Sequence, residues 1–298
     1  MVSFAAFSDR KTRDAARALL SRLLTLDDRS SGFATVQVGN AWSSDQYDGL
    51  FHLPADAAPV LPSISLVFVQ SRDGNTGAKN PGDLGGGPVD LHLIYEGLSR
   101  VGADAVLAGA GTIHGEQTFF SVWHPELVAL RAALGQPRHP AQIVVTGKGC
   151  LDVERSLLFN VPDVPVYVIS TPGGCEALER AVSTRPSMEL VPMRNGDLRE
   201  PLEYLRRERG ISRISAIGGR TTASSLIDAG LVQDICLTTT ARAGGEPNTP
   251  LYVGKRLPPQ TRLIVRKRGQ DPAYPILFEH LRVVTEQVAE KRQPEGKR

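Results

Sequence analysis

The chain is short of cysteine, of aromatic residues and of long apolar runs, and each shortage excludes a class of protein. Its 298 residues include only three cysteines, Cys150, Cys175 and Cys236, which lie far apart. They form no Cys-x-x-Cys pair and no zinc-type spacing with histidine, so we expect buried, reduced thiols and no metal site. No run approaches the roughly 18 apolar residues of a membrane-spanning helix, so we expect no membrane partner.

Excess charge of either sign is also lacking. The formal net charge is +2, with both signs interspersed, which gives no electrostatic reason to expect a nucleic-acid partner. The N-terminal sequence MVSFAAFSDRKTRDAAR places its charges after a very short apolar stretch. A secretory signal has the reverse order, so the sequence predicts a cytoplasmic protein.

Several nucleotide-binding and catalytic motifs are missing. No Gly-x-x-x-x-Gly-Lys-Ser/Thr occurs, which excludes a P-loop enzyme, and no Gly-x-Ser-x-Gly occurs, which excludes the hydrolase nucleophile elbow. The segment GAGTIHGE at residues 109–116 lacks the third glycine of the dinucleotide fingerprint at its proper place. A dehydrogenase of the Rossmann type is therefore disfavoured.

Two regions and a tail can be distinguished along the chain. Apolar residues near helical spacing predict an amphipathic helix over residues 10–26, a short strand follows at 33–38, and prolines punctuate residues 54–62. Because this part carries no chemical motif, we interpret residues 1–62 as an N-terminal extension packed on the main domain. The polar residues 286–298 predict a disordered tail.

From residue 63 to residue 285 the pattern alternates between strands and helices. Strands are predicted over residues 64–70, 104–108, 143–146, 166–170, 188–192, 213–217, 234–240, 262–266 and 276–279. Helices are predicted over residues 91–101, 125–134, 175–183, 198–208 and 221–229. Such alternation is typical of an α/β fold with a mixed, mostly parallel sheet and helices on both faces.

Small residues follow four of these strands, at the ends where ligands bind in such sheets. The loops are Gly109-Ala110-Gly111-Thr112, Thr146-Gly147-Lys148-Gly149, Ser170-Thr171-Pro172-Gly173-Gly174 and Gly218-Gly219-Arg220-Thr221-Thr222. Glycine lets a backbone approach a phosphate, and the N–H groups at the next helix N-terminus bind the anion. One such loop is usually only a tight turn, but four at one edge of a sheet indicate a ligand site.

Three blocks of sequence resemble the pyrimidine reductases of riboflavin biosynthesis, a family that includes the bacterial RibD C-terminal domain. They are SRDGNTG (71–77), RVGADAVLAGAGTIHGE (100–116) and IGGRTTASSLIDAGLVQDICLTTTARAGG (217–245). The blocks keep the order and spacing of the family across residues 63–285. No deaminase motif of the His-x-Glu…Pro-Cys-x-x-Cys type accompanies them.

The resemblance implies a dihydrofolate-reductase-like fold, an NADPH cofactor and a ribosylaminopyrimidine 5′-phosphate as substrate. The matching positions are Gly109, Gly111, Thr112 and Glu116 along the cofactor, Gly218, Gly219, Arg220, Thr221 and Thr222 at the pyrophosphate, and Thr146, Gly147 and Lys148 near the adenosine 2′-phosphate. A lysine there would pair with the phosphate that distinguishes NADPH from NADH, although a loop lysine can also be merely solvated.

Asp73 is the catalytic candidate on the substrate side, and its alternative role is to form the turn before Gly74. The chain departs from the family at Asn75, where a basic residue is usual, and at Arg242, where proline is usual. The helix over residues 88–100 also lacks the arginine and histidine cluster that grips a substrate phosphate. The proton donor is not identified by the sequence.

Two other functions stay open. One is a reductase of another heterocycle, such as a folate or pterin, and the other is an NADPH-binding protein without turnover. Because the strands predicted after residue 234 would leave an apolar sheet edge that needs cover, and because family members assemble as dimers, we also expect a homodimer.

Overall fold

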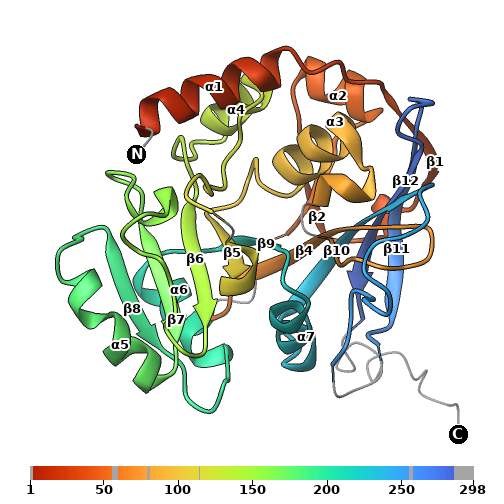
Figure 1. Cartoon of the computed structure of the whole chain (residues 1–298). Coiled ribbons are helices and arrows are strands. Elements are labelled where there is room, and N and C mark those ends of the chain that lie inside the picture. The colour runs from red at the N-terminus through yellow and green to blue at the C-terminus, as the bar shows by residue number, and fades with distance from the viewer. Residues whose placement is uncertain (1–2, 56–59, 79–80, 114, 255–257, 285–298) are drawn as a thin grey trace, which may run out of the picture.

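The computed structural model describes residues 3–55, 60–78, 81–113, 115–254 and 258–284, so the predicted disordered tail at 286–298 lies outside the described residues. One sheet of ten strands runs through the molecule in the order β1-β11-β12-β10-β4-β9-β5-β6-β7-β8, and β2 and β3 form a separate pair (Figure 1). The strands are β1 (Leu23–Asp28), β2 (Thr35–Val38), β3 (Phe51–Pro54), β4 (Ser63–Gln70), β5 (Ala105–Gly109), β6 (Ala141–Thr146), β7 (Val166–Ser170), β8 (Met188–Pro192), β9 (Arg213–Ile217), β10 (Val232–Thr240), β11 (Thr261–Gly269) and β12 (Ile276–Val283).

The sheet is mixed and mostly parallel, as the alternation predicts. Neighbours are parallel from β10 through β4, β9, β5, β6 and β7 to β8. The β1–β11, β11–β12 and β12–β10 pairs are antiparallel. Because the parallel strands share one direction, all their carboxyl ends lie at one edge of the sheet, and the loops that follow them meet there.

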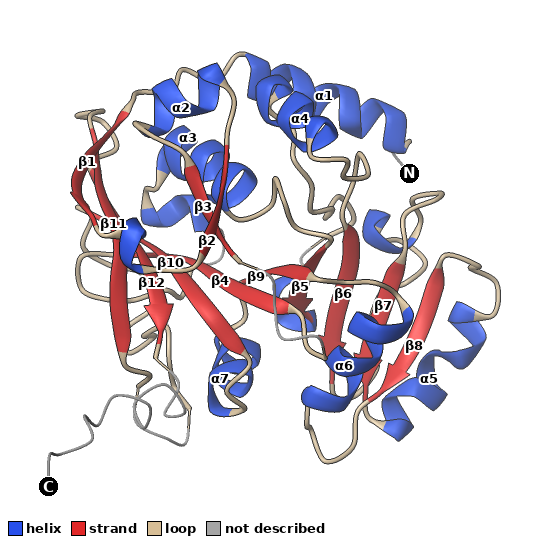
Figure 2. Ribbon diagram, turned by 180° about the vertical axis from the view of Figure 1, so that it is seen from behind, coloured by secondary structure: helices blue, strands red, loops and turns tan. Residues whose placement is uncertain are grey.

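Helices cover both faces, and alternate residues of each strand supply the two cores (Figures 1 and 2). Leu107 of β5 belongs to the core under α6 and α7, whereas Val106 belongs to the core under η3 and α4. The helices are α1 (Phe4–Ala16), α2 (Ala41–Tyr47), α3 (Gly87–Val89), π-helix η3 (Asp90–Leu98), α4 (Pro125–Ala133), α5 (Pro172–Val182), α6 (Arg199–Glu208) and α7 (Arg220–Asp228), with short turns η1 (Ser30–Gly32), η2 (Pro81–Leu84), η4 (Ala110–Thr112) and η5 (Leu157–Phe159).

Every strand and helix predicted between residues 63 and 283 is present, with shifted bounds, but the N-terminal prediction needs correction. The helix predicted over residues 10–26 is wrong: α1 begins after its cap Ser3 and ends at Ala16, and residues 23–28 form strand β1. Leu23 is buried while Leu24 and Leu26 are exposed, an alternation that fits a strand with one face on the core. The sequence analysis also missed α2 and β3.

A buried lysine ties the N-terminal segment to the sheet. Lys267 of β11 is only 2% exposed, and its ammonium donates to Thr25 Oγ1 at 2.7 Å and to the Asp48 carbonyl at 3.1 Å. It also lies 4.1 Å from the centre of the Tyr47 ring. Burial lowers the pKa of this lysine to about 8. The segment before residue 62 therefore supplies both the edge strand and the partners of a buried cation.

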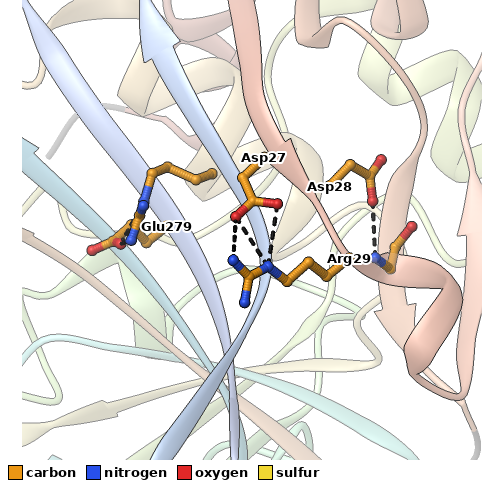
Figure 3. A network of polar contacts seen from close by, with 6 residues as sticks. Asp27, Asp28, Arg29 and Glu279 are labelled. Carbon is orange, nitrogen blue, oxygen red and sulfur yellow. Dashed lines mark hydrogen bonds and ion pairs between the residues drawn. The ribbon is translucent and has the colours of Figure 1, made fainter.

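Polar contacts cluster around the edge strand β1 and its neighbours. Arg29 pairs with Asp27, the Ser30 N–H donates to Asp28, and Glu279 of β12 accepts from Arg266 close by (Figure 3). The outward Thr25 N–H already donates to Asp48 Oδ2 at 2.8 Å. Since β1 covers β11, the uncovered edge that motivated the homodimer is not present, and the oligomeric state itself stays a prediction.

Within the described ranges, none of the helices combines the length and the apolar character that crossing a bilayer requires.

Candidate active site

The four glycine-containing loops lie beside one another at the carboxyl edge of the sheet. They follow β9, β5, β6 and β7, and these strands are consecutive neighbours in the sheet. The loop after β4, which contains Asp73, is next in line beside the β9 loop. Segments separated by more than a hundred residues thus form one continuous row, which is the arrangement that the sequence predicts for a ligand site.

The β5 and β9 loops meet so closely that only glycine fits. A Cβ atom on Gly109 would lie 2.5 Å from Thr222 Oγ1, and one on Gly218 would lie 2.9 Å from Thr112 Cγ2. Gly218 and Gly219 have φ angles of 62° and 76°, in the left-handed region that glycine adopts without strain. Gly109, Thr112, Gly218, Gly219 and Thr222, all predicted cofactor residues, therefore form one cluster.

The N-terminus of α7 opens onto this cluster. Its N-cap residue is Gly219, and no side chain caps the helix, so the first N–H groups, at Arg220, Thr221 and Thr222, have no partner within the helix. Thr221 is exposed and its two neighbours are half-buried. Free N–H groups at the positive end of a helix dipole favour an anion such as a phosphate.

The β6 and β7 loops support each other and leave a lysine exposed. Thr171 Oγ1 donates to the Gly147 carbonyl at 2.6 Å, and a Cβ on Gly149 would lie 2.4 Å from the Gly174 carbonyl oxygen. Thr146 is buried, and its hydroxyl accepts from the Gly149 N–H at 3.2 Å. Lys148 is exposed, so a cation is available at this end of the row.

Gly111 and Glu116, the other two predicted cofactor residues, are less tied to the cluster. Gly111 is exposed, with no atom within 4 Å of the place where a Cβ would lie. Glu116 is also exposed, and its carbonyl accepts from the Leu157 N–H at 2.8 Å. The contact of Glu116 is thus with the η5 turn and not with the paired glycine loops.

Asp73 holds a neighbouring loop. Its Oδ2 accepts from the Gly244 N–H at 2.8 Å, while Oδ1 lies 3.8 Å from Arg72 Nε. Asn75, which stands where the family usually has a basic residue, donates to the Gly244 carbonyl and accepts from the Thr249 N–H. The loop after β4 is therefore fixed to the loop after β10, with the Asp73 side chain 47% exposed at the junction.

One residue near the loops after β4 and β10, a region called the Asp73 corner below, was missed by the sequence analysis: Asp90. It begins the π-helix η3 and is 5% exposed, with Thr238 Oγ1 of β10 donating to its Oδ1 at 2.5 Å. Burial raises the pKa of its carboxyl to about 7. π-Helices are rare and are frequent at functional sites. The run Gly85-Gly86-Gly87 shortly before this helix was a signal for a close contact, but it did not predict that Asp90 is buried.

Arg242, which the sequence analysis noted only as a departure from the family's usual proline, also lies near Asp73. Its carbonyl accepts from the Arg72 N–H at 2.9 Å, and its side chain lies on Gly85, where a Cβ would be 2.7 Å from Arg242 Cδ. Gly85 has a φ of 90°, so glycine is required there for both reasons. In the part of the chain described, Arg242 is exposed and makes no ion pair. Arg242 thus places a cation at this corner.

A well-defined cavity lies elsewhere. It measures about 760 Å³ and is lined by residues 159–167 and 184–189, at the amino ends of β7 and β8. This is the edge opposite the glycine loops, so we do not assign the cavity to the candidate site. Across the described residues, no group of three or more histidine, cysteine or carboxylate side chains is placed to hold a metal ion.

Comparisons with known proteins agree with this geometry. The family model for the RibD C-terminal domain matches residues 62–271. A search of curated proteins finds no match. Among solved structures, a pyrimidine reductase-like protein from Corynebacterium diphtheriae is 20% identical, with a TM-score of 0.55, covering 76% of this chain and 93% of that one.

Two larger proteins share the fold over part of their length. RibD from Acinetobacter baumannii is 14% identical with a TM-score of 0.56, covering 76% of this chain and 59% of its own. A diaminohydroxyphosphoribosylaminopyrimidine deaminase/5-amino-6-(5-phosphoribosylamino)uracil reductase from Thermotoga maritima is 17% identical with a TM-score of 0.52, at 75% and 57% coverage. This chain spans less than two thirds of either protein. The predicted dihydrofolate-reductase-like fold class is confirmed.

Proposed function

Because the chain belongs to the RibD C-terminal domain family, we propose that it is an NADPH-dependent reductase that acts on a ribosylaminopyrimidine-type substrate. The observation that carries the proposal is the paired β5 and β9 loops, whose glycines and threonines meet at the uncapped N-terminus of α7. The family supports a pyrimidine reductase-like oxidoreductase. The NADPH cofactor and the ribosylaminopyrimidine substrate are what the resemblance to the family implies, and we propose them for this chain.

We assign residues of the glycine-containing loops after β5, β6 and β9 to the pyrophosphate, the remaining length and the 2′-phosphate of NADPH. The N–H groups of Arg220, Thr221 and Thr222, with Gly218 and Gly219, would bind the pyrophosphate. Gly109, Gly111 and Thr112 would line the cofactor, Glu116 would take the acidic position, and Thr146, Gly147 and Lys148 would lie at the adenosine 2′-phosphate. When bound, NADPH supplies a hydride, and the chain supplies orientation and electrostatics.

Selectivity for NADPH over NADH tests the proposal. We expect NADPH to bind about ten- to a hundredfold more tightly, because one charge-assisted contact from Lys148 to the 2′-phosphate contributes roughly 1.5–3 kcal/mol. Fluorescence titration of the wild type and of Lys148→Ala with NADPH and with NADH measures this difference in affinity. Arg207→Ala removes an exposed cation on α6, away from the loops, and should leave the affinities unchanged. Equal affinity of the wild type for both cofactors would contradict the proposal.

Asp73 is proposed to act on the substrate, since it is half-exposed at the end of β4. Asp73→Asn should lower turnover about tenfold or more, because the variant loses a charge but keeps an oxygen that can accept from the Gly244 N–H. NADPH affinity and melting temperature should stay near the wild-type values. Unchanged turnover, or a joint fall in stability and cofactor affinity, would leave Asp73 with the loop-holding role alone.

A reductase of another heterocycle is the second candidate, and Asn75 favours it. This residue is held by Gly244 and Thr249, so it does not replace the family's basic residue at the substrate. NADPH consumption with 5-amino-6-(5-phosphoribosylamino)uracil and with dihydrofolate separates the two candidates, and consumption with neither favours a binding protein without turnover. We also propose that the protein is cytoplasmic, that it forms a homodimer, and that residues 1–62 are an N-terminal extension of the reductase domain.

A further inference from the structure

Among the described residues, three carboxyl side chains are buried: those of Asp90, Glu96 and Asp234. Asp90 differs from the other two, because the one side-chain hydrogen bond described for it comes from the uncharged Thr238. Glu96 accepts from the N–H groups of Trp123 and His124 and lies 3.2 Å from His92 Nδ1. Asp234 pairs with His280 at 2.9 Å and with Arg282. A buried carboxyl that is not compensated by a cation is destabilising when ionised, and such groups concentrate at functional sites.

The position of Asp90 points to the substrate side of the candidate site. A Cβ on Gly86 would lie 2.6 Å from Asp90 Oδ2, so the carboxyl lies directly against the Gly85-Gly86-Gly87 loop. The neighbouring Gly85 contacts Arg242, whose carbonyl holds the Arg72 N–H next to Asp73. The loop has no side chains of its own, because its three residues are glycines, and the side chains that lie on it are Arg242 at Gly85 and Tyr274 at Gly87.

The groups that face Asp90 are uncharged near neutral pH. The half-buried Tyr95 of its own helix and the buried Cys236 of β10 lie beside it, and desolvation raises the pKa of both far above neutrality. Thr238 donates a hydrogen bond to Oδ1, which orients the carboxyl and leaves Oδ2 for another partner. The raised pKa of Asp90, about 7, therefore results from desolvation, with Thr238 only partly opposing it.

We propose that Asp90 is the acid that delivers a proton to the substrate nitrogen during reduction of a carbon–nitrogen double bond. This inference rests on the proposed function, in which NADPH is the reductant. The carbon of the C=N bond takes up the hydride, with its electron pair, and the nitrogen takes the proton of Asp90. The O–H bond breaks, an N–H bond forms, and the resulting carboxylate recovers its proton from water. A ribosylamine in its open imine form is such a substrate, and its product is the ribityl amine.

The main test compares the wild type with Asp90→Asn, which keeps the size of the side chain and an oxygen for Thr238. NADPH oxidation with 5-amino-6-(5-phosphoribosylamino)uracil should fall about a hundredfold or more, the order that general acid catalysis contributes. The wild-type rate should decline as pH rises through about 7, where Asp90 loses its proton. Asp90→Glu should restore part of the rate and the pH dependence.

Two readouts do not depend on turnover. Infrared difference spectra of wild type against Asp90→Asn should show a protonated carboxyl near pH 6, and NADPH affinity should be equal in the two proteins. Unchanged turnover in Asp90→Asn with NADPH still bound, or no protonated carboxyl in the difference spectrum, overturns the Asp90 proposal alone. A wild type that binds no NADPH overturns the proposed function, and this inference with it.

Discussion

Gly219→Val is expected to raise the dissociation constant of NADPH at least about a hundredfold while the chain stays folded. Gly219 is the N-cap of α7, and a side chain there would project toward Thr112 Oγ1 at 3.2 Å and Thr222 Oγ1 at 3.6 Å. It would occupy the space in which a pyrophosphate must approach the helix N–H groups. Loss of that close approach removes several charge-assisted hydrogen bonds at once.

The backbone strain of the substitution needs its own control. Gly219 has a φ of 76°, so any L-residue there is strained by roughly 1–2 kcal/mol. Gly210 has a φ of 68° and open space around it, just before β9, at the edge away from the loops. Gly210→Val should therefore carry the same strain and keep cofactor binding. Normal NADPH binding by a folded Gly219→Val variant would mean that the β9 loop is only a turn.

The row of loops could be predicted because its signals are local. Strands β5, β6, β7 and β9 are short, mainly apolar runs, and glycine and threonine at or after their ends mark the turns. Because the strands are parallel, their turns lie at one edge of the sheet, and no individual contact has to be known to predict this. The contact of Gly109 with Thr222 could not be predicted in this way, because it depends on β5 and β9 being neighbours in the sheet, and local signals do not give the strand order.

The features that were missed depend on partners far away in the sequence. Residues 23–28 form a strand because β11 pairs with them, and Thr25 meets Lys267 across 242 positions. Helical spacing of alanines and leucines gave the wrong element there. Asp90 is buried because η3 packs against β10, where Thr238 lies 148 positions away. An aspartate near the start of a helix ordinarily predicts a solvated residue that favours the helix dipole, so its burial had no sequence signal.

The free energy of unfolding should carry a pH signature of Asp90. Its pKa is about 7 in the folded chain and near the ordinary 3.8 when unfolded. Between these values the folded state holds a proton that the unfolded state releases, so the stability of the wild type falls as pH rises through this window and is level above it. From about pH 5 to about pH 7.5 the loss is of the order of 2–3 kcal/mol.

The measurement is a difference between the wild type and Asp90→Asn, because other groups also titrate. Burial lowers the pKa of His124 and of His139 to about 4, which makes stability rise with pH between about 4 and 6.5, and Lys267 acts similarly above about pH 8. Both proteins share these contributions, so they cancel in the difference. Urea unfolding at several pH values should show Asp90→Asn gaining stability relative to the wild type as pH rises. A difference that is constant from about pH 5 to about pH 7.5 would mean that Asp90 is ionised throughout, and a carboxylate could not serve as the acid.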